Sequence, residues 1–223
     1  MTSSFTTEGF EIIRGILSET QLAALREEAE RVAISAGSVC VRHLRSRSEI
    51  FDKLSESNMI LSHLPEGLRP VRSILFDKTP EENWPVPWHQ DITIAVSEEH
   101  DVPGYGPWSH KDGVPHVQPP IALLHHMVTI RLHLDDTPAA NGALRVIPRS
   151  NLRGKISADS ITANDKENAI TCECMAGDAV LMSPLLLHAS QRSLEPARRR
   201  VIHLEYARPD DLDPKLSWFE KLA

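Results

Sequence analysis

The feature that most constrains the fold is a series of short apolar runs, separated by turn residues, in the part of the chain after position 70. Runs of four to eight residues bounded by Gly, Pro, Asn and Asp are typical of β-strands. Such runs cover residues 71–76, 92–96, 127–134, 143–147, 169–174, 179–182 and 201–206. Seven short strands without helical patterns between them predict a mainly β fold, a sandwich or jelly roll with flanking helices, and they exclude an alternating parallel sheet.

The first 70 residues carry helical patterns instead. A capping box, Ser18-Glu19-Thr20-Gln21, precedes apolar residues at helical spacing, and Gly37 follows the expected end of this helix. A short strand is predicted at 10–13 and a second helix at 48–57. Neither helix can bury its apolar side alone. We therefore expect a single domain over residues 1–223, in which residues 1–70 form a helical support for a jelly-roll core at 71–207.

The composition excludes several classes of function. The 31 acidic side chains outnumber the 24 basic ones, and the net charge of −7 disfavours binding to nucleic acid or to an anionic membrane. No apolar run approaches the roughly 20 residues that span a bilayer, and the first residues have no secretory-signal pattern. The three cysteines are too few for a disulfide framework. These features predict a cytoplasmic protein, and they leave its oligomeric state open.

The segment 97–120 differs from the rest of the strand region because it is rich in proline and glycine and also carries Tyr105 and Trp108. A structureless loop of this length inside a compact domain is usually functional or disordered. The aromatic residues favour a lid over a pocket. The alternative is an ordinary surface excursion.

His-x-Asp pairs are the first candidate metal ligands. Residues two apart in an extended segment point to the same face, so such a pair can bind one metal ion. With a distant histidine it completes the two-histidine, one-carboxylate triad of non-haem Fe(II) enzymes. Three pairs occur, His89-Gln90-Asp91, His110-Lys111-Asp112 and His133-Leu134-Asp135. The spacing alone does not choose among them, although Asp135 lies in a turn pattern that explains it without a metal.

A third ligand and an anion site are indicated near the end of the chain. His188 closes a long apolar run and Ser190 follows on the same face, while Arg198-Arg199-Arg200 opens the next strand. A guanidinium suits bidentate binding of a dicarboxylate. Taken singly, His188 is explained as a core histidine and the arginines as a solvated strand end. Simple alternation of apolar residues turns Arg200 inward rather than Arg199.

From about Arg72 to Ala207 the sequence resembles the phytanoyl-CoA dioxygenase-like family of Fe(II)/2-oxoglutarate-dependent oxygenases. Three segments carry the resemblance: Trp88-His-Gln-Asp91, the stretch 134–150 with its Asn141-Gly-x-Leu-x-Val-x-Pro148 motif, and the stretch 176–190, followed by Arg199. The resemblance implies a double-stranded β-helix, the cupin-like jelly roll. Family members usually have glycine at the position of Arg149, so the turn there departs from the pattern.

The resemblance also implies roles for individual residues. His89, Asp91 and His188 become the iron ligands and catalytic residues, and the motif of the family selects this His-x-Asp pair. The distal carboxylate of 2-oxoglutarate is expected at Arg199 and Ser190, and the family register selects Arg199 over Arg200. Gln90 is expected to line the co-substrate site.

Three further residues have open roles. Arg131 and Thr129 lie on the central predicted strand and are also assigned to the co-substrate site, where Arg131 either adds a second anion contact or faces solvent. Lys78 either reaches an anionic ligand or is an ordinary solvated lysine.

The function expected from these residues is an Fe(II)- and 2-oxoglutarate-dependent dioxygenase that uses O2 to hydroxylate a C–H bond of a small organic substrate, with release of succinate and CO2. Halogenating relatives lack the metal carboxylate, whereas Asp91 is present, which favours a hydroxylase. The alternative is a non-catalytic jelly-roll protein that binds a ligand. A zinc hydrolase on the same ligands leaves the arginine unexplained. No segment resembles a coenzyme A-binding signature, so the substrate itself is not readable.

Overall fold

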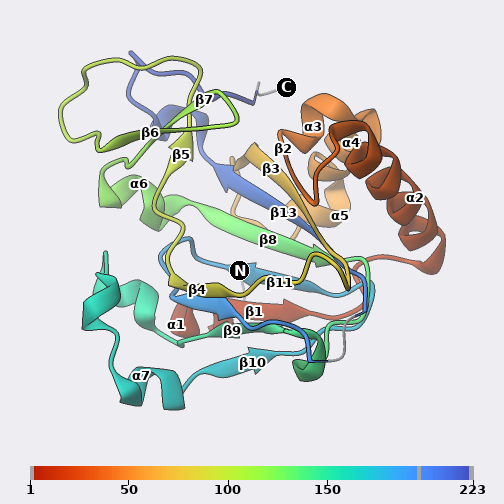
Figure 1. Ribbon diagram of the computed structural model, residues 1–223. Coiled ribbons are helices and arrows are strands. Elements are labelled where there is room, and N and C mark those ends of the chain that lie inside the picture. Colours follow the sequence, from red (N-terminus) through yellow and green to blue (C-terminus); the bar gives the residue numbers. More distant parts are fainter. Residues whose placement is uncertain (1–2, 195–196, 221–223) are drawn as a thin grey trace.

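The computed structural model describes residues 3–194 and 197–220. Its centre is formed by two facing antiparallel sheets, with helices covering the larger one (Figure 1). The larger sheet has six strands in the order β1 (Phe10–Ile13), β11 (Ala179–Met182), β8 (Val128–His133), β13 (Arg199–Ala207), β3 (Arg69–Lys78) and β2 (Cys40–Arg42). The smaller sheet has four, in the order β10 (Ile170–Cys172), β9 (Leu144–Val146), β12 (His188–Ser190) and β4 (Val86–His89). The chain passes repeatedly from one sheet to the other, so the prediction of a jelly roll with flanking helices is confirmed.

Helices from the N-terminal part of the chain cover the outer face of the larger sheet. They are α2 (Glu19–Ala36), α3 (Leu44–Arg47), α4 (Glu49–Ser55) and α5 (Asn58–Leu61), whereas α1 (Ser3–Glu8) lies beside the edge strand β1. The predicted capping box starts α2, and Gly37 ends it in the left-handed conformation with φ 59°. The apolar side of α2 packs in the main core against β8, β11 and β13. The N-terminal part also adds β1 and β2 to the edges of the larger sheet, so it does more than support the core with helices.

Two functional strands were not predicted from the sequence. β4 and β12 have only four and three residues, and their backbones pair with each other. Segments this short are stabilised by pairing with distant strands rather than by a local pattern. The predicted strand at 92–96 is also reduced, to β5 (Ile94–Ala95).

The segment 97–120 is not structureless, and this corrects the prediction. It folds into a hairpin of β6 (Trp108–Lys111) and β7 (Val114–Val117), which joins β5 in a three-stranded sheet. Asp112 and Gly113 form the two-residue turn, both with positive φ, and an Asp-Gly pair is a strong hairpin pattern. The frequent proline and glycine residues obscured it. Val102 and Val117 pack into a separate core with α6 (Ile121–His126).

The remaining elements are short. They are α7 (Ala163–Glu167) and four 3₁₀ turns at Ala139–Asn141, Ser150–Arg153, Ala158–Ser160 and Pro209–Asp211. The turn before Ser150 keeps the geometry that glycine favours, because Arg149 has φ 65°. Within the described ranges, no helix combines the length and the apolar character needed to cross a membrane.

Candidate active site

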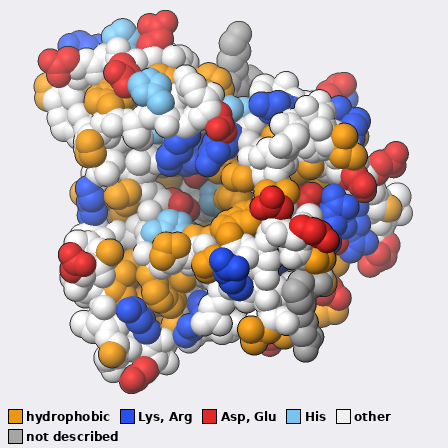
Figure 2. Space-filling view, viewed as in Figure 1, with side chains coloured by type: hydrophobic (Ala, Val, Ile, Leu, Met, Phe, Trp, Pro, Cys, Tyr) orange, Lys and Arg blue, Asp and Glu red, His pale blue; other side chains and the backbone are white. Residues whose placement is uncertain are grey.

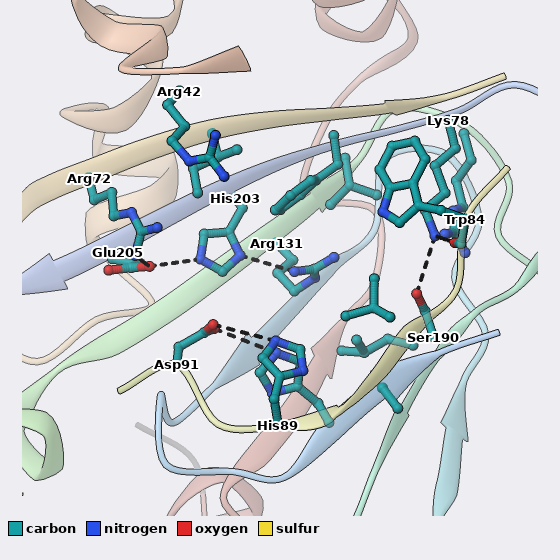
Figure 3. Close-up of a pocket in the computed structure, with 18 residues that line it drawn as sticks. Arg42, Arg72, Lys78, Trp84, His89, Asp91, Arg131, Ser190, His203 and Glu205 are labelled. Atoms are coloured by element: carbon teal, nitrogen blue, oxygen red, sulfur yellow. Dashed lines mark hydrogen bonds and ion pairs between the residues drawn. The ribbon is translucent and has the colours of Figure 1, made fainter. Parts of the chain in front are cut away.

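The two sheets enclose a cavity of about 180 Å³ (Figure 3). Strands β3, β8 and β13 form one wall, and β4 and β12 form the other. Side chains alternate along β13, so Arg199, Val201, His203 and Glu205 line the cavity while the residues between them face the helices. Figure 2 shows histidine side chains in a hollow at the middle of one face of the molecule.

Backbone pairing brings together the three residues expected to bind iron. His89 and His188 are direct partners in the β4–β12 pair, and their ring centroids are 4.2 Å apart. Asp91 follows β4, where its backbone N–H donates to the carbonyl of Pro184 at 2.8 Å. Its two carboxylate oxygens lie 3.7 Å from His89 Nε2 and 3.6 Å from His188 Nε2. One ligand atom from each residue therefore lies within 4.8 Å of the other two.

Both imidazoles present an acceptor nitrogen to this cluster. The Nδ1 atoms of His89 and His188 lie 2.8 and 2.9 Å from the backbone carbonyls of Pro87 and Leu186. A carbonyl only accepts hydrogen bonds, so each Nδ1 carries the proton and each Nε2 keeps its lone pair. This is the tautomer that a metal requires at Nε2.

The protonation states also suit a cation. Burial lowers the pKa of His188 to about 3, so its ring is neutral near pH 7. Burial by itself would raise the pKa of Asp91, but the imidazole of His188 foremost, with His203, His89 and Arg72, holds it below its ordinary value. Asp91 Oδ2 is buried and has no hydrogen-bond partner in the part of the chain that the structure describes. Two lone pairs and a carboxylate facing one another are a ligand set that fits a divalent metal ion.

The competing His-x-Asp pairs are used elsewhere. The Asp135 carboxylate accepts two side-chain hydrogen bonds from Arg200, at 2.7 and 2.8 Å. Asp112 forms an ion pair with Arg42 at 2.8 Å. Within the described residues, neither pair belongs to a group of three side chains that could hold a metal.

A second group that could hold a metal shares Asp91 and adds His203 and Glu205. The atoms of His203 and Glu205 that would bind a metal are already engaged in hydrogen bonds. Arg131 donates to His203 Nδ1 at 3.0 Å, so His203 Nε2 carries the proton and donates to Glu205 Oε1 at 3.1 Å. Glu205 also accepts from Arg72 at 2.9 Å. This hydrogen-bonded series leaves the His89–Asp91–His188 cluster as the better metal site.

Arg199 lies at one end of the cavity. Its Nη1 donates to the carbonyl of Asn141 at 2.9 Å, and burial, followed by the charge of Arg131, lowers its pKa to about 10. A Cβ at Gly142 would lie 2.9 Å from this Nη1, which explains the glycine of the Asn141-Gly142 motif. Arg200 points to the opposite face, towards Asp135. The structure therefore places Arg199, and not Arg200, in the cavity.

Two more basic groups share this end of the cavity. Lys78 is the strand partner of Arg199, and its Nζ lies 3.4 Å from the hydroxyl of Ser190. Burial foremost, then the charges of Arg199 and Arg131, lowers the pKa of Lys78 to about 7. Arg131 lines the cavity rather than facing solvent. None of the three forms an ion pair with an acidic side chain of the described residues, so this end is suited to an anion.

The structure does not bring Gln90 or Thr129 to the cavity wall. Gln90 points away from His89 and Asp91, because neighbours in an extended segment face opposite ways. Its amide donates to the carbonyls of Gly154 and Leu185 and accepts from the Ile156 N–H. Thr129 is buried on β8 opposite Glu205, two residues before Arg131, and lies outside the cavity lining.

Several cavity residues were missed in the sequence. His203 and Glu205 lie on the same face of β13 as Arg199, and the two-residue spacing along the strand was sufficient to find them. Arg42 lies on β2, a strand without a clear pattern, and Arg72 begins the inward-facing positions of β3.

Comparisons with known proteins agree with this geometry. The family model described as phytanoyl-CoA dioxygenase (PhyH) matches residues 5–201. No curated protein matches the chain.

Solved structures share the fold at low sequence identity. The epimerase SnoN, in complex with Fe3+, alpha ketoglutarate and nogalamycin RO, is 17% identical with a TM-score of 0.72, over 93% of this chain and 82% of that one. The alpha ketoglutarate-dependent carbocyclase SnoK is 18% identical with a TM-score of 0.70, over 94% and 85%. HygX from Streptomyces hygroscopicus, with nickel, 2-oxoglutarate and hygromycin B bound, is 18% identical with a TM-score of 0.65, over 93% and 87%.

Proposed function

Since the chain belongs to the phytanoyl-CoA dioxygenase (PhyH) family, we propose that it is an Fe(II)- and 2-oxoglutarate-dependent dioxygenase that hydroxylates a C–H bond of a small organic substrate. The observation that carries the proposal is the pairing of two complementary sites in one cavity. The His89–Asp91–His188 cluster offers only lone pairs and negative charge, whereas the neighbouring Arg199 end offers unpaired positive charge. A metal ion would satisfy the first site, and a carboxylate of 2-oxoglutarate would satisfy the second.

The iron ligands in this proposal are His89, Asp91 and His188. Their Nδ1 contacts with backbone carbonyls hold both rings in orientation and keep their Nε2 atoms available. When bound, Fe(II) would supply the activation of O2 that oxidises 2-oxoglutarate to succinate and CO2 and the substrate C–H bond to an alcohol. Three protein ligands leave coordination positions open for the co-substrate and O2.

The co-substrate is expected to lie along the cavity between the two sites. The 2-oxo acid end of 2-oxoglutarate faces the iron ligands, and its distal carboxylate binds Arg199 and Ser190, with Lys78 as a third partner. Arg131 adds positive charge along the same path, and its contact with His203 fixes its position. A bound dianion would stabilise the charged form of Lys78, whose pKa burial otherwise lowers to about 7.

Hydroxylation is favoured by the carboxylate of Asp91 in the metal site. Structural neighbours named as an epimerase and a carbocyclase show that this fold also accommodates other outcomes. The alternative of a binding protein without catalysis has no observation in its favour, and it is retained as an outcome of the test.

Oxygen-dependent turnover tests the proposal. Protein loaded anaerobically with Fe(II) and 2-oxoglutarate should show a weak visible charge-transfer band. After addition of ¹⁸O2 and a screen of small organic compounds, succinate should form with one ¹⁸O atom, and the oxidised product should carry the other. Ni(II)-loaded protein is the matched control and should form no succinate. A protein that shows neither the band nor labelled succinate is a binding module rather than an oxygenase.

A further inference from the structure

The end of the cavity away from Arg199 carries a second group of basic side chains. Arg72 lies six residues before Lys78 on β3, which is about 20 Å along a strand, and it also lines the cavity. Arg42 on β2 lines the same end (Figure 3). Lys111, on the β6–β7 hairpin, lies near these two arginines but outside the cavity lining, and its Nζ donates to the hydroxyl of Thr93 at 3.3 Å. The iron ligands lie between this group and the Arg199 end.

Basic side chains at this end outnumber the acidic side chains that are available to pair with them. Glu205 accepts from Arg72, but it accepts from His203 as well. Asp112 pairs with Arg42, yet its side chain is 57% exposed at the tip of the hairpin. Lys111 forms no ion pair with an acidic side chain in the described part of the chain. Apart from Asp91, which is assigned to the metal, two carboxylates therefore face three cations.

The hydrogen-bonding capacity of the two arginines is also incomplete. The Nε atoms of Arg42 and Arg72 are buried, and neither has a hydrogen-bond partner among the described residues. Burial foremost, then the charges of Arg72 and Arg42, lowers the pKa of Lys111, so the three groups lie within one another's field. A buried N–H donor without a partner is costly, and an anion would satisfy several of them at once.

We propose that the primary substrate carries an anionic group, a carboxylate or a phosphate, that binds Arg42 and Arg72 with Lys111 beside them. This inference rests on the proposed function, because 2-oxoglutarate is assigned to the Arg199 end and leaves this end to the substrate. The anionic group anchors the substrate, and the carbon to be oxidised then faces the iron ligands. Without substrate, Asp112 forms an ion pair with Arg42, and the substrate anion competes with Asp112 for this arginine.

Binding of simple anions to protein saturated with Ni(II) and 2-oxoglutarate tests this proposal, because these ligands fill the metal site and the Arg199 end. The probes are inorganic phosphate, butanoate and its neutral counterpart butanamide, measured by calorimetric titration. At least one anion should bind about tenfold or more tightly than butanamide, in line with a charge-assisted hydrogen bond. The tighter of the two anions identifies the chemical class.

Two variants and a control give the expected pattern. Arg42→Gln should weaken anion binding about tenfold, whereas Asp112→Asn should strengthen it about threefold or more, because it frees Arg42. Asparagine tolerates the φ of 51° at this turn. Arg145→Gln is the matched control, since Arg145 stacks 5.6 Å from the Trp88 ring and lies outside the cavity lining. It should leave anion binding unchanged.

The proposal would be overturned if neither phosphate nor butanoate binds more tightly than butanamide, or if Arg42→Gln and Arg145→Gln behave identically. The Fe(II)–2-oxoglutarate band of the wild-type protein is recorded in parallel. If the band forms and the anions do not bind, only the substrate class is refuted. If the band does not form, the proposed function itself fails.

Discussion

Replacing His188 by alanine is expected to remove stoichiometric iron binding and to lower 2-oxoglutarate turnover by about 1000-fold or more. His188 is buried, its Nε2 faces Asp91, and the remaining His89 and Asp91 adjoin the open side of the cavity. Two ligands without the third hold a divalent ion weakly and do not define the open coordination positions. Iron content after gel filtration and the rate of succinate formation measure the two effects.

The control for this variant is His125→Ala, which removes an exposed histidine of α6. It should keep the iron content and the turnover of the wild-type protein. Circular dichroism and thermal unfolding separate loss of the metal from loss of the fold, since His188→Ala also leaves a small cavity in the β12 region. Full iron content and turnover in folded His188→Ala would reassign the ligand.

Replacing Arg199 by methionine is expected to raise the KM for 2-oxoglutarate about 100-fold. A bidentate guanidinium–carboxylate contact in a buried site contributes about 3 kcal/mol, which corresponds to roughly that factor. Arg199→Lys keeps the charge but loses the fork geometry, so it should lie between the methionine variant and the wild-type protein. Initial rates of succinate formation against 2-oxoglutarate concentration give the comparison.

The adjacent Arg200 is the matched control. It faces away from the cavity and binds Asp135, so Arg200→Gln should lower stability while leaving the KM for 2-oxoglutarate unchanged. The converse pattern, with a raised KM only in Arg200→Gln, would contradict the assignment of Arg199.

The longer elements of the fold were predictable because their patterns are local. The capping box and the apolar spacing of α2 act within a few turns of helix, and the runs of β8, β11 and β13 are rich in residues that favour strands. β4 and β12 were not predictable, because their pairing with each other depends on residues about 100 positions apart in the chain. Pro87 within β4 also weakens its strand pattern, although an edge strand tolerates it.

The candidate site was predictable only in part. Spacing suggested the His89–Asp91 pair, and the position of His188 after an apolar run suggested a third ligand. The family resemblance then selected this pair and chose Arg199 over Arg200. The resemblance assigned Gln90 to the co-substrate site together with its neighbours. The alternation of side chains along an extended segment instead points Gln90 away from the cavity. The basic group of Arg42, Arg72 and Lys111 was missed because its members come from three strands that only the folded chain brings together.

A crystal structure of the protein with Ni(II) and 2-oxoglutarate, with the metal located by its anomalous scattering, tests the central assignment most directly. We expect one metal ion bound by the Nε2 atoms of His89 and His188 and by the Asp91 carboxylate, with the distal carboxylate of 2-oxoglutarate on Arg199. A metal bound through His203 and Glu205, or at a place remote from all three proposed ligands, would contradict it.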